Sequence, residues 1–449
     1  MTDFNLMVTP RRQGVCADGS TELDVLVRVQ APDAPAVGAG RRKHRLNLAF
    51  VIDRSGSMNG RPLEEAKRCV SAMAAALQPD DRAALVAYDD EVHLLQSSLP
   101  IGDNRVLCEL VNGIHSGGTT NLHGGWLRGA GALADTLDEN QLARVILLSD
   151  GMANEGETHV GTIAKQCAEL ASTGVTTSTY GLGHSFNEAL MVAMAREGCG
   201  NHYYGRTADD LMGPFREEFA LLENLCARDV RLSVRGEPGV EVKMRNAYPL
   251  VGGHAWKLPD LAYDGEAWAL LRVRVAPGVR NRIDAEGRLA LLEVSASFAT
   301  LDGGDGELPV STLRLPVVND ETWNRLEEDA TVSRRAMELE AARYQRRVAE
   351  AARNHDWARV DQLLGEAETR AGENPWVHEV LDGLRGIAQE RDDVMLSKEA
   401  TYGAARMDSR LAGKDAVFED LMDAQVEASK RPYLRRKRMQ GRREFEDEQ

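Results

Sequence analysis

Hydrophobic positions follow two different patterns along the 449-residue chain. Between residues 46 and 222, continuous apolar segments alternate with amphipathic ones; the apolar kind includes LNLAFVID, AALVAY and ARVILLSD. A strand that is buried on both faces gives such a continuous apolar run, and a helix is the usual connection between parallel strands. We therefore predict a doubly wound, mainly parallel α/β domain over residues 46–222.

Outside this segment, apolar and polar positions alternate in the way that is typical of half-exposed strands. The alternation runs through DVRLSVRG, WALLRVRVA, RLALLEVSASFAT and STLRLPVV, which predicts an antiparallel β-sandwich over residues 223–320. An earlier strand, TELDVLVRVQAP, has no partner nearby in the sequence, so we expect residues 1–45 to contribute strands to the sandwich. The α/β domain would then be an insertion in it.

The C-terminal part of the chain is rich in charged residues. Residues 321–429 are helical in pattern, and we interpret this helical region as a solvated hairpin or, alternatively, as a docking arm for a partner. Residues 430–449 form a basic and then acidic tail that we expect to be disordered; the alternative for its basic part is binding to nucleic acid or to an acidic surface. The predicted fold class is α/β plus all-β plus all-α.

Composition narrows the classes of function. A formal net charge of −16 argues against a nucleic-acid binder as a whole, and 43% hydrophobic residues suit a globular chain of two to four domains. The six cysteines are scattered singly, which is typical of reduced thiols. We find no secretory signal and no apolar run of the roughly 18 residues that a membrane span needs. We therefore expect a cytoplasmic protein.

Candidate chemistry lies where the predicted strands end. Asp53, Ser55 and Ser57 follow the first apolar strand of the α/β domain, and Asp150 ends the strand ARVILLSD. Ligands gather at the carboxyl ends of parallel strands, so these groups converge if the two strands are neighbours. For each loop taken alone, capping of the following helix is the ordinary explanation.

A third loop, SGGTTNLHGG, places Thr119 and Thr120 before a predicted helix. The three loops together favour a shared site. Their segments DRSGS (53–57), GGTTN (117–121) and LLSDG (147–151) resemble the complete metal-ion-dependent adhesion site of the von Willebrand factor A domain family, in which these loops hold a magnesium ion.

The resemblance covers residues 46–222 and implies a role for each residue. Ser55, Ser57 and Thr120 would contact the ion through their hydroxyls, with Thr119 the less favoured choice in its loop. Asp53 and Asp150 would hold waters and the serine hydroxyls in an outer shell. Mg²⁺ prefers six oxygen ligands and keeps several waters; Mn²⁺ or Ca²⁺ could take its place.

Such a site suggests capture of a partner protein. Three neutral hydroxyls leave the charge of the ion largely unquenched, so an Asp or Glu side chain of a partner can replace a water. The resemblance also suggests an AAA+ ATPase as a possible partner, on a separate chain because GxxxxGK[ST] is absent here. Acidic segments of the chain itself, EFEDEQ or LDGGDGE, could instead occupy the ion and close the site.

Two other classes of function compete with this interpretation. A metal-activated hydrolase would use a nearby base, and His115, His123 and His184 lie in or near the same loops. No HExxH pattern or nucleophile elbow accompanies them, so we expect no enzymatic activity. A scaffold that binds nucleic acid through the basic tail is the other alternative, and its binding would weaken steeply with salt.

Overall fold

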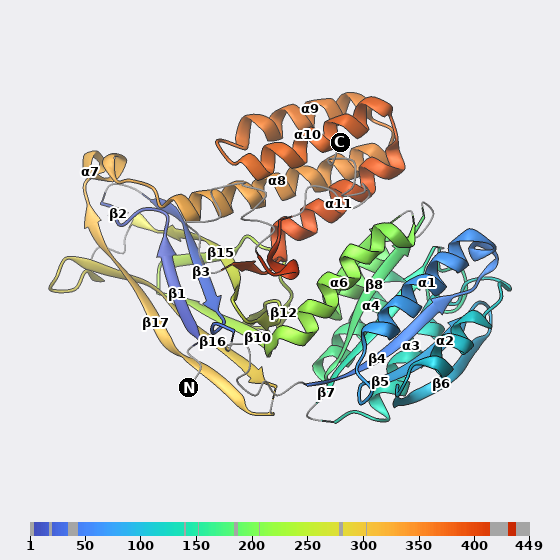
Figure 1. Cartoon of the computed structure of the whole chain (residues 1–449). Helices are drawn as coiled ribbons and strands as arrows, with labels where there is room; N and C mark the ends of the chain where they lie inside the picture. Colours follow the sequence, from blue (N-terminus) through green and yellow to red (C-terminus); the bar gives the residue numbers. More distant parts are fainter. Residues whose placement is uncertain are drawn as a thin grey trace. The chain divides into compact units, whose positions relative to one another are not determined.

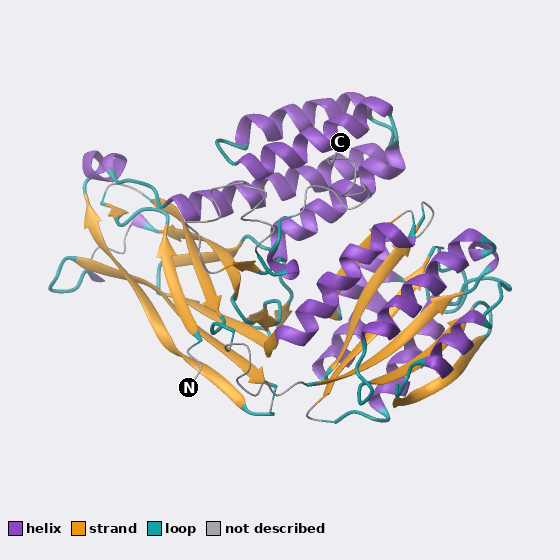
Figure 2. Ribbon diagram, in the orientation of Figure 1, coloured by secondary structure: helices purple, strands orange, loops and turns teal. Residues whose placement is uncertain are grey.

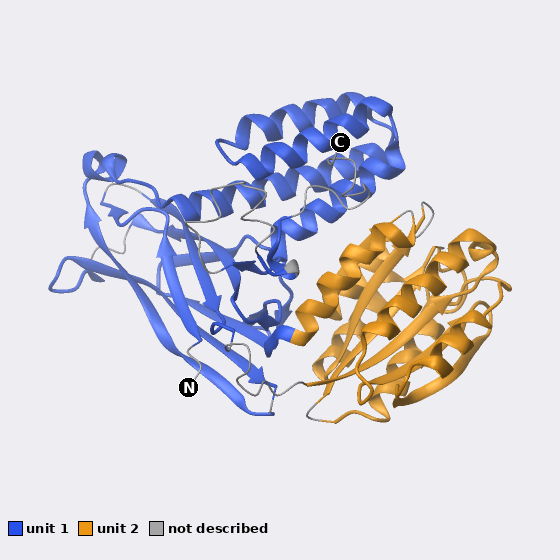
Figure 3. Cartoon of the chain, in the orientation of Figure 1, with its two compact units in different colours: residues 1–39, 224–438 blue, residues 40–223, 439–449 orange. Residues whose placement is uncertain are grey.

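The computed structural model describes residues 4–17, 20–34, 44–138, 141–150, 152–183, 187–205, 207–277, 282–301, 303–413 and 430–436. The chain divides into two compact units (Figure 3). Described residues between 40 and 223 form the first, called here the α/β unit. Those before residue 40 and those from 224 onward form the second, called here the composite unit because it combines sheets and helices.

The α/β unit is built on one six-stranded sheet with the order β6-β5-β4-β7-β8-β9. The pairs from β5 to β9 are parallel, and only the edge strand β6 is antiparallel to its neighbour. The strands are β4 (Arg45–Asp53), β5 (Arg82–Tyr88), β6 (Val92–Pro100), β7 (Gln141–Ser149), β8 (Val175–Leu182) and β9 (Cys199–Gly205).

Helices cover both faces of this sheet (Figure 2). They are α1 (Arg61–Ala76), α2 (Arg105–Asn112), α3 (Leu122–Ala134), α4 (Val160–Ser172), α5 (Glu188–Glu197) and α6 (Ala208–Asn224). Trp126 of α3 is fully buried, and its indole N–H donates to Thr177 of β8 at 3.0 Å. A Cβ at Gly129 would lie 2.4 Å from Val51, so only glycine lets α3 pack this closely on β4.

Strand order fixes where the candidate loops meet. β4 lies between β5 and β7, and Ile52 of β4 pairs with Leu148 of β7 in parallel register. The carboxyl ends of these strands therefore open onto the same edge of the sheet. A short 3₁₀ helix, η1 (Gly56–Met58), leads from that edge into α1.

Strands of the composite unit form two sheets. The first has the order β1-β3-β15-β11 with β18 also on β15, and the second β12-β13-β10-β16-β17-β2 with β14 also on β10. All described pairs are antiparallel except that between β17 and β2. The strands are β1 (Asn5–Pro10), β2 (Val15–Cys16), β3 (Thr21–Gln30), β10 (Leu225–Gly236), β11 (Val240–Met244), β12 (Leu250–Val251), β13 (Ala255–Lys257), β14 (Leu261–Ala262), β15 (Gly265–Val275), β16 (Arg288–Thr300), β17 (Asp305–Val318) and β18 (Ala412–Gly413).

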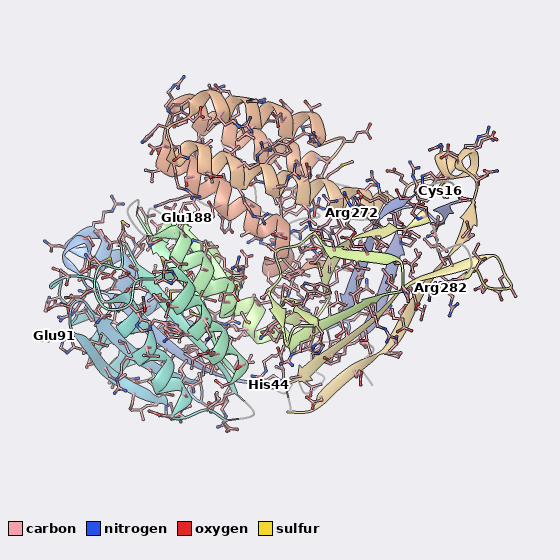
Figure 4. The ribbon with its side chains drawn as sticks, turned by 180° about the vertical axis from the view of Figure 1, so that it is seen from behind. Cys16, His44, Glu91, Glu188, Arg272 and Arg282 are labelled. Atoms are coloured by element: carbon pink, nitrogen blue, oxygen red, sulfur yellow. The ribbon has the colours of Figure 1, made fainter. Side chains whose placement is uncertain are left out.

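The early strand joins strands that come more than 200 residues later. Val25 of β3 pairs with Leu271 of β15, so the α/β unit is inserted in the sequence between β3 and β10. Charged pairs accompany the register: Arg272 of β15, labelled in Figure 4, bonds to Glu22 at 2.8 Å and to Asp24 at 2.9 Å. The two sheets contact each other where β1 meets β16 and β17.

The helical region belongs to the composite unit. It consists of α7 (Asp320–Arg325), α8 (Ala330–Arg353), α9 (Trp357–Arg370), α10 (Pro375–Glu390) and α11 (Asp393–Ser409). The last four pack together, as Figure 1 shows, whereas α7 lies against β2. Val332, Ala336 and Leu339 of α8 share a core with Leu26 and Trp268 of the first sheet. The interpretation as a solvated hairpin is therefore wrong, because α8 buries an apolar face on the sheet. Residues 414–429 lie outside the described residues.

The start of the predicted tail is ordered rather than disordered. Tyr433 and Leu434, in the short helix η4 (Pro432–Leu434), are buried. The Arg431 guanidinium donates to Asp264 at 2.6 Å, and the Tyr433 hydroxyl donates to the Tyr263 carbonyl at 3.0 Å. The expectation of disorder from residue 430 is wrong for residues 430–436, because their aromatic and basic side chains bond within the unit. Residues 437–449, with the EFEDEQ segment, lie outside the described residues.

None of the helices in the described ranges has the length and the apolar stretch that crossing a membrane requires.

Candidate metal centre

Three loops meet at the carboxyl edge of the α/β sheet. The first follows β4 and carries Ser55 and Ser57, the second precedes α3 and carries Thr120, and the third follows β7 and begins with Asp150. Main-chain hydrogen bonds tie the first two loops together. The Gly56 N–H donates to the Gly118 carbonyl at 2.9 Å, and the Gly117 N–H donates to the Arg54 carbonyl at 2.7 Å.

Asp53 lies at the buried end of the site. Its side chain is fully shielded from solvent, and its two oxygens accept from different elements. Oδ1 accepts from the Ser55 backbone N–H at 2.9 Å, and Oδ2 accepts from the Ser149 hydroxyl at 2.6 Å. Burial raises the pKa of Asp53, although these hydrogen bonds act in the opposite direction. The carboxylate therefore joins the ends of β4 and β7.

A chain of polar groups leads from Asp53 towards solvent. Ser55 is buried and its Oγ lies 3.2 Å from the Oγ of Ser57, which is exposed. Ser57 Oγ donates to Asp150 Oδ1 at 2.9 Å. Burial raises the pKa of Asp150 to about 6; the bond from Ser57 lowers it and the nearby charge of Asp53 raises it further. Two buried carboxylates thus flank two hydroxyls.

Thr120 is held by its backbone rather than by its side chain. The Thr120 N–H donates to Asn154 Oδ1 at 2.9 Å, and the Thr120 carbonyl accepts from the N–H groups of Asn154 and Glu155, both at 3.2 Å. The adjacent Thr119 is exposed, and its hydroxyl bonds to the Glu155 carboxylate. Among the described residues, the Thr120 hydroxyl takes no part in the chain formed by Ser55, Ser57 and Asp150.

Sequence reasoning missed one residue that connects these loops. Asp89 follows β5 directly, is 3% exposed and accepts from Arg54 Nη2 and from the Gly118 N–H, both at 3.0 Å. The strand pattern AALVAY is followed directly by Asp89, much as the other two strands end in an aspartate. No hydroxyl-rich motif follows Asp89, so the sequence alone does not connect it with the site.

The histidines contribute little to the site. His115 is exposed, and His123 Nε2 lies 2.7 Å from Gln166 Oε1; His184 lies outside the described residues. In the described part of the chain, no group of three or more His, Cys, Asp and Glu residues is arranged to hold a metal ion. The oxygen donors brought together at the sheet edge are hydroxyls with two carboxylates behind them, a set that suits a hard cation.

Comparison with known proteins agrees with this fold. Residues 47–213 match the model of the von Willebrand factor type A domain. A structure titled von Willebrand factor type A from Catenulispora acidiphila is 18% identical, with a TM-score of 0.67 over 88% of this chain and 97% of that one. The ArnB paralog VWA2 from Sulfolobus acidocaldarius is 17% identical, with a TM-score of 0.59 over 90% of this chain and 99% of that one.

Curated relatives match over shorter parts of their own length. The Escherichia coli protein YfbK, itself described as uncharacterized, is 24% identical over 76% of this chain and 63% of its own. The human inter-alpha-trypsin inhibitor heavy chain H3 is 30% identical over 39% of this chain and 21% of its own. This chain therefore spans less than two thirds of these relatives. Residues 47–213, within the α/β unit, are therefore similar to a von Willebrand factor type A domain.

Proposed function

We propose that the α/β unit captures an acidic side chain of a partner protein through a Mg²⁺ ion held by Ser55, Ser57 and Thr120. The observation that carries the proposal is the polar chain at the sheet edge. Two hydroxyls 3.2 Å apart stand between the buried carboxylates Asp53 and Asp150. Mn²⁺ or Ca²⁺ would use the same oxygen donors.

The donor set fits a magnesium ion. Magnesium is bound by oxygen ligands and retains several waters, so a site with few protein ligands near solvent is suitable. When bound, the ion supplies a positive charge and an exchangeable position for a carboxylate oxygen of the partner. Because hydroxyls are neutral, Ser55, Ser57 and Thr120 would leave most of that charge available.

The two aspartates have a separate role in this proposal. Asp53 fixes the start of the first loop through the Ser55 N–H, and Asp150 orients the Ser57 hydroxyl. Their negative charges lie close enough that the charge of Asp53 raises the pKa of Asp150. A cation between them would relieve this repulsion, which favours metal binding without direct carboxylate ligands.

Calorimetric titration of metal-stripped protein with Mg²⁺ and Mn²⁺ tests the site. We expect Ser55→Ala and Asp53→Ala to abolish measurable binding while the far-ultraviolet circular dichroism spectrum is retained. Ser172→Ala is the control, because its exposed hydroxyl lies at the C-terminal end of α4 and bonds to the Glu169 carbonyl at 2.6 Å. Unchanged metal affinity in both site variants would refute the proposal.

Partner capture is tested separately from metal binding. Immobilised wild-type and Ser55→Ala chains are exposed to lysate in Mg²⁺ or in EDTA, and retained proteins are identified. We expect retention to require both Ser55 and Mg²⁺. An AAA+ ATPase is one partner class to look for. Retention that ignores EDTA but falls steeply with salt would point to charge alone.

We propose no catalytic role for this site. His123 is engaged by Gln166 and His115 is exposed, so neither is placed beside the hydroxyls as a base by a described contact. Basic residues that suggested a nucleic-acid scaffold are partly used internally: Arg436 is 3% exposed, lies over the Trp376 ring and pairs with Glu338 at 3.5 Å. Turnover of phosphatase or esterase substrates with Mg²⁺ would contradict this assignment.

A further inference from the structure

We propose that Asp89 is a positioning residue for the candidate metal centre, holding the two hydroxyl-bearing loops in register without serving as a ligand. This inference rests on the proposed function, because it concerns the geometry of the same site. It adds a third strand-end aspartate, from β5, to the pair that the sequence motif contains. Its action is exerted through Arg54 in the first loop and Gly118 in the second.

The contacts of the Asp89 side chain divide between the two loops. Arg54, which lies between Asp53 and Ser55 in the sequence, places its guanidinium Nη2 2.9 Å from Asp89 Oδ2 and 3.0 Å from Oδ1. The Gly118 N–H, two residues before Thr120, donates to Oδ2 at 3.0 Å. One buried carboxylate therefore determines the position of a residue next to the serines and of a residue next to the threonine.

Main-chain bonds around Asp89 reinforce this connection. The Asp89 carbonyl accepts from the Asn121 N–H at 2.8 Å, on the other side of Thr120 from Gly118. The Arg54 N–H donates to the Tyr88 carbonyl at 2.8 Å, so β5 also holds the first loop directly. Thr120 is thus bracketed by two bonds to the same aspartate.

The approach of the second loop to this carboxylate requires a residue without a side chain. A Cβ built at Gly117 would lie 1.9 Å from Asp89 Oδ2, closer than any real contact. Glycine at this position lets the loop backbone lie against the carboxylate. The glycine that precedes Gly118 and Thr120 in the motif is therefore explained by Asp89 rather than by the metal.

The charge of Asp89 is neutralised where it lies. Both carboxylate oxygens are engaged: Oδ1 accepts from the Glu91 N–H at 3.0 Å as well as from Arg54, and Oδ2 faces Arg54 and Gly118. A carboxylate used in this way is not available to coordinate a cation. Asp89 supplies geometry, whereas Asp53 and Asp150 supply the negative charge at the site.

The same strand offers a matched control. Asp81 directly precedes β5, is 1% exposed and accepts backbone N–H bonds from Leu46 at 2.9 Å and Gln78 at 2.7 Å. It is similarly buried and also accepts backbone N–H bonds, but it lies at the opposite end of β5 from Asp89. Asp89→Asn and Asp81→Asn therefore remove comparable buried charges at the two ends of one strand.

Two measurements on the full chain test the inference. In Mn²⁺ titration we expect Asp89→Asn to weaken binding by about 10-fold or more, as loss of an outer-shell partner does, and Asp81→Asn to leave it within about twofold. In metal-free hydrogen–deuterium exchange we expect faster exchange at Gly117 and Gly118 only in Asp89→Asn. Arg54→Gln is the second variant if Asp89→Asn does not fold, and the double variant should bind no more weakly than the worse single one.

The outcomes separate this inference from the proposed function. If the wild type binds Mn²⁺ and Asp89→Asn binds it equally well, the inference is refuted and the metal site stands. If both aspartate variants weaken binding equally, Asp89 acts through stability alone and the inference is also refuted. A wild type that binds no Mn²⁺ refutes the proposed function; slower or unchanged exchange at Gly118 in Asp89→Asn refutes the role of Asp89 in holding the loop.

Discussion

The Ser149 hydroxyl donates a hydrogen bond of 2.6 Å to Asp53 Oδ2, and this bond joins the last residues of two adjacent parallel strands. Both side chains are fully buried. Asp53 therefore has a fixed carboxylate orientation before any ligand arrives, since its other oxygen accepts from the Ser55 N–H. In the sequence Ser149 directly precedes Asp150, whereas in the fold its hydroxyl bonds to Asp53.

Removing this hydroxyl should destabilise the α/β unit. Ser149→Ala leaves the buried Asp53 carboxylate with one hydrogen-bond donor fewer, and we expect the free energy of unfolding to fall by about 2 kcal/mol. Urea unfolding at pH 7 in EDTA measures this change in the free energy of unfolding. Ser172→Ala is the control, because that exposed hydroxyl bonds to the Glu169 carbonyl at the end of α4. Equal stability of Ser149→Ala and wild type would show that the bond does not support Asp53.

Metal addition should stabilise the same unit if the proposed site exists. A ligand that binds only the folded state adds about 2.7 kcal/mol at a concentration of 100 times its dissociation constant. We expect thermal unfolding of the wild type to shift upward with Mg²⁺ and to return with EDTA, and Ser57→Ala to show no shift. An equal shift in Ser57→Ala would place any bound metal elsewhere on the chain.

Much of the fold could be read from hydrophobic pattern alone. The strand that begins near Leu46 is continuous and apolar because its residues are buried on both faces of a parallel sheet. The alternation around Val25 identifies a strand, and Val25 pairs with Leu271. It does not show that the other face is buried too, where Leu26 shares a core with Val332 of α8.

Charge was a poorer guide to the helical region. Arg335 and Glu338 read as surface residues, yet they are 1% and 0% exposed and pair with each other at 2.8 Å. Arg335 also lies over the Trp268 ring, 4.8 Å from its centroid. Buried and solvent-exposed ion pairs use the same residue types. The charged residues of α8 therefore did not indicate that the helix packs on the sheet.

The sequence predicted only part of the candidate site, because the rest depends on how distant strands pair. Asp53, Ser55 and Ser57 lie within five residues, and Asp150 has the same strand-end position, so local pattern and family resemblance both find them. The role of Asp89 depends on β5 lying beside β4, and no local sequence pattern reveals that strand order. Residues that position a site through tertiary neighbours are the ones that motif reasoning misses.

An ion pair outside the site offers a pH-dependent prediction. Glu328, just before α8, lies 2.7 Å from Arg11 and 3.0 Å from Arg12; burial opposes its ionisation, but the bonds from these arginines prevail and lower its pKa. A lowered folded-state pKa gives stability that is present above the unfolded value of about 4.5 and is lost as pH falls. Because the pair is partly exposed, we expect Glu328→Gln to cost about 0.5 kcal/mol at pH 7.

The comparison of wild type and Glu328→Gln by urea unfolding at pH 7 and pH 4 checks this sign. The stability difference between the two chains should shrink at the lower pH. There the Glu328 carboxyl of the unfolded wild-type chain accepts a proton more readily than that of the folded chain, whose pKa is lowered. A difference that grows as pH falls would mean that Glu328 is not stabilised as an anion by Arg11 and Arg12.

The buried ion pair of Arg144 and Glu218 should be the most sensitive polar contact of the α/β unit. The two side chains are 3% and 0% exposed and contact each other, and Glu218 also accepts from Ser178 at 2.6 Å and from Asn201 at 2.8 Å. Glu218→Ala would leave a buried guanidinium without this carboxylate, which typically costs about 3–5 kcal/mol. Glu223→Ala, at an exposed position of the same helix α6, is the control and should cost far less.

The double variant Arg144→Met/Glu218→Leu distinguishes two explanations of that loss. If the cost of Glu218→Ala arises from the stranded positive charge of Arg144, removing both charges should recover much of the stability, because desolvation of the pair is then no longer required. If the double variant is as unstable as Glu218→Ala, the hydrogen bonds of Ser178 and Asn201 to Glu218 carry the stability instead. Urea unfolding of the wild type, Glu218→Ala, Glu223→Ala and the double variant decides between the stranded charge and the hydrogen-bond network. Circular dichroism at 222 nm is the signal.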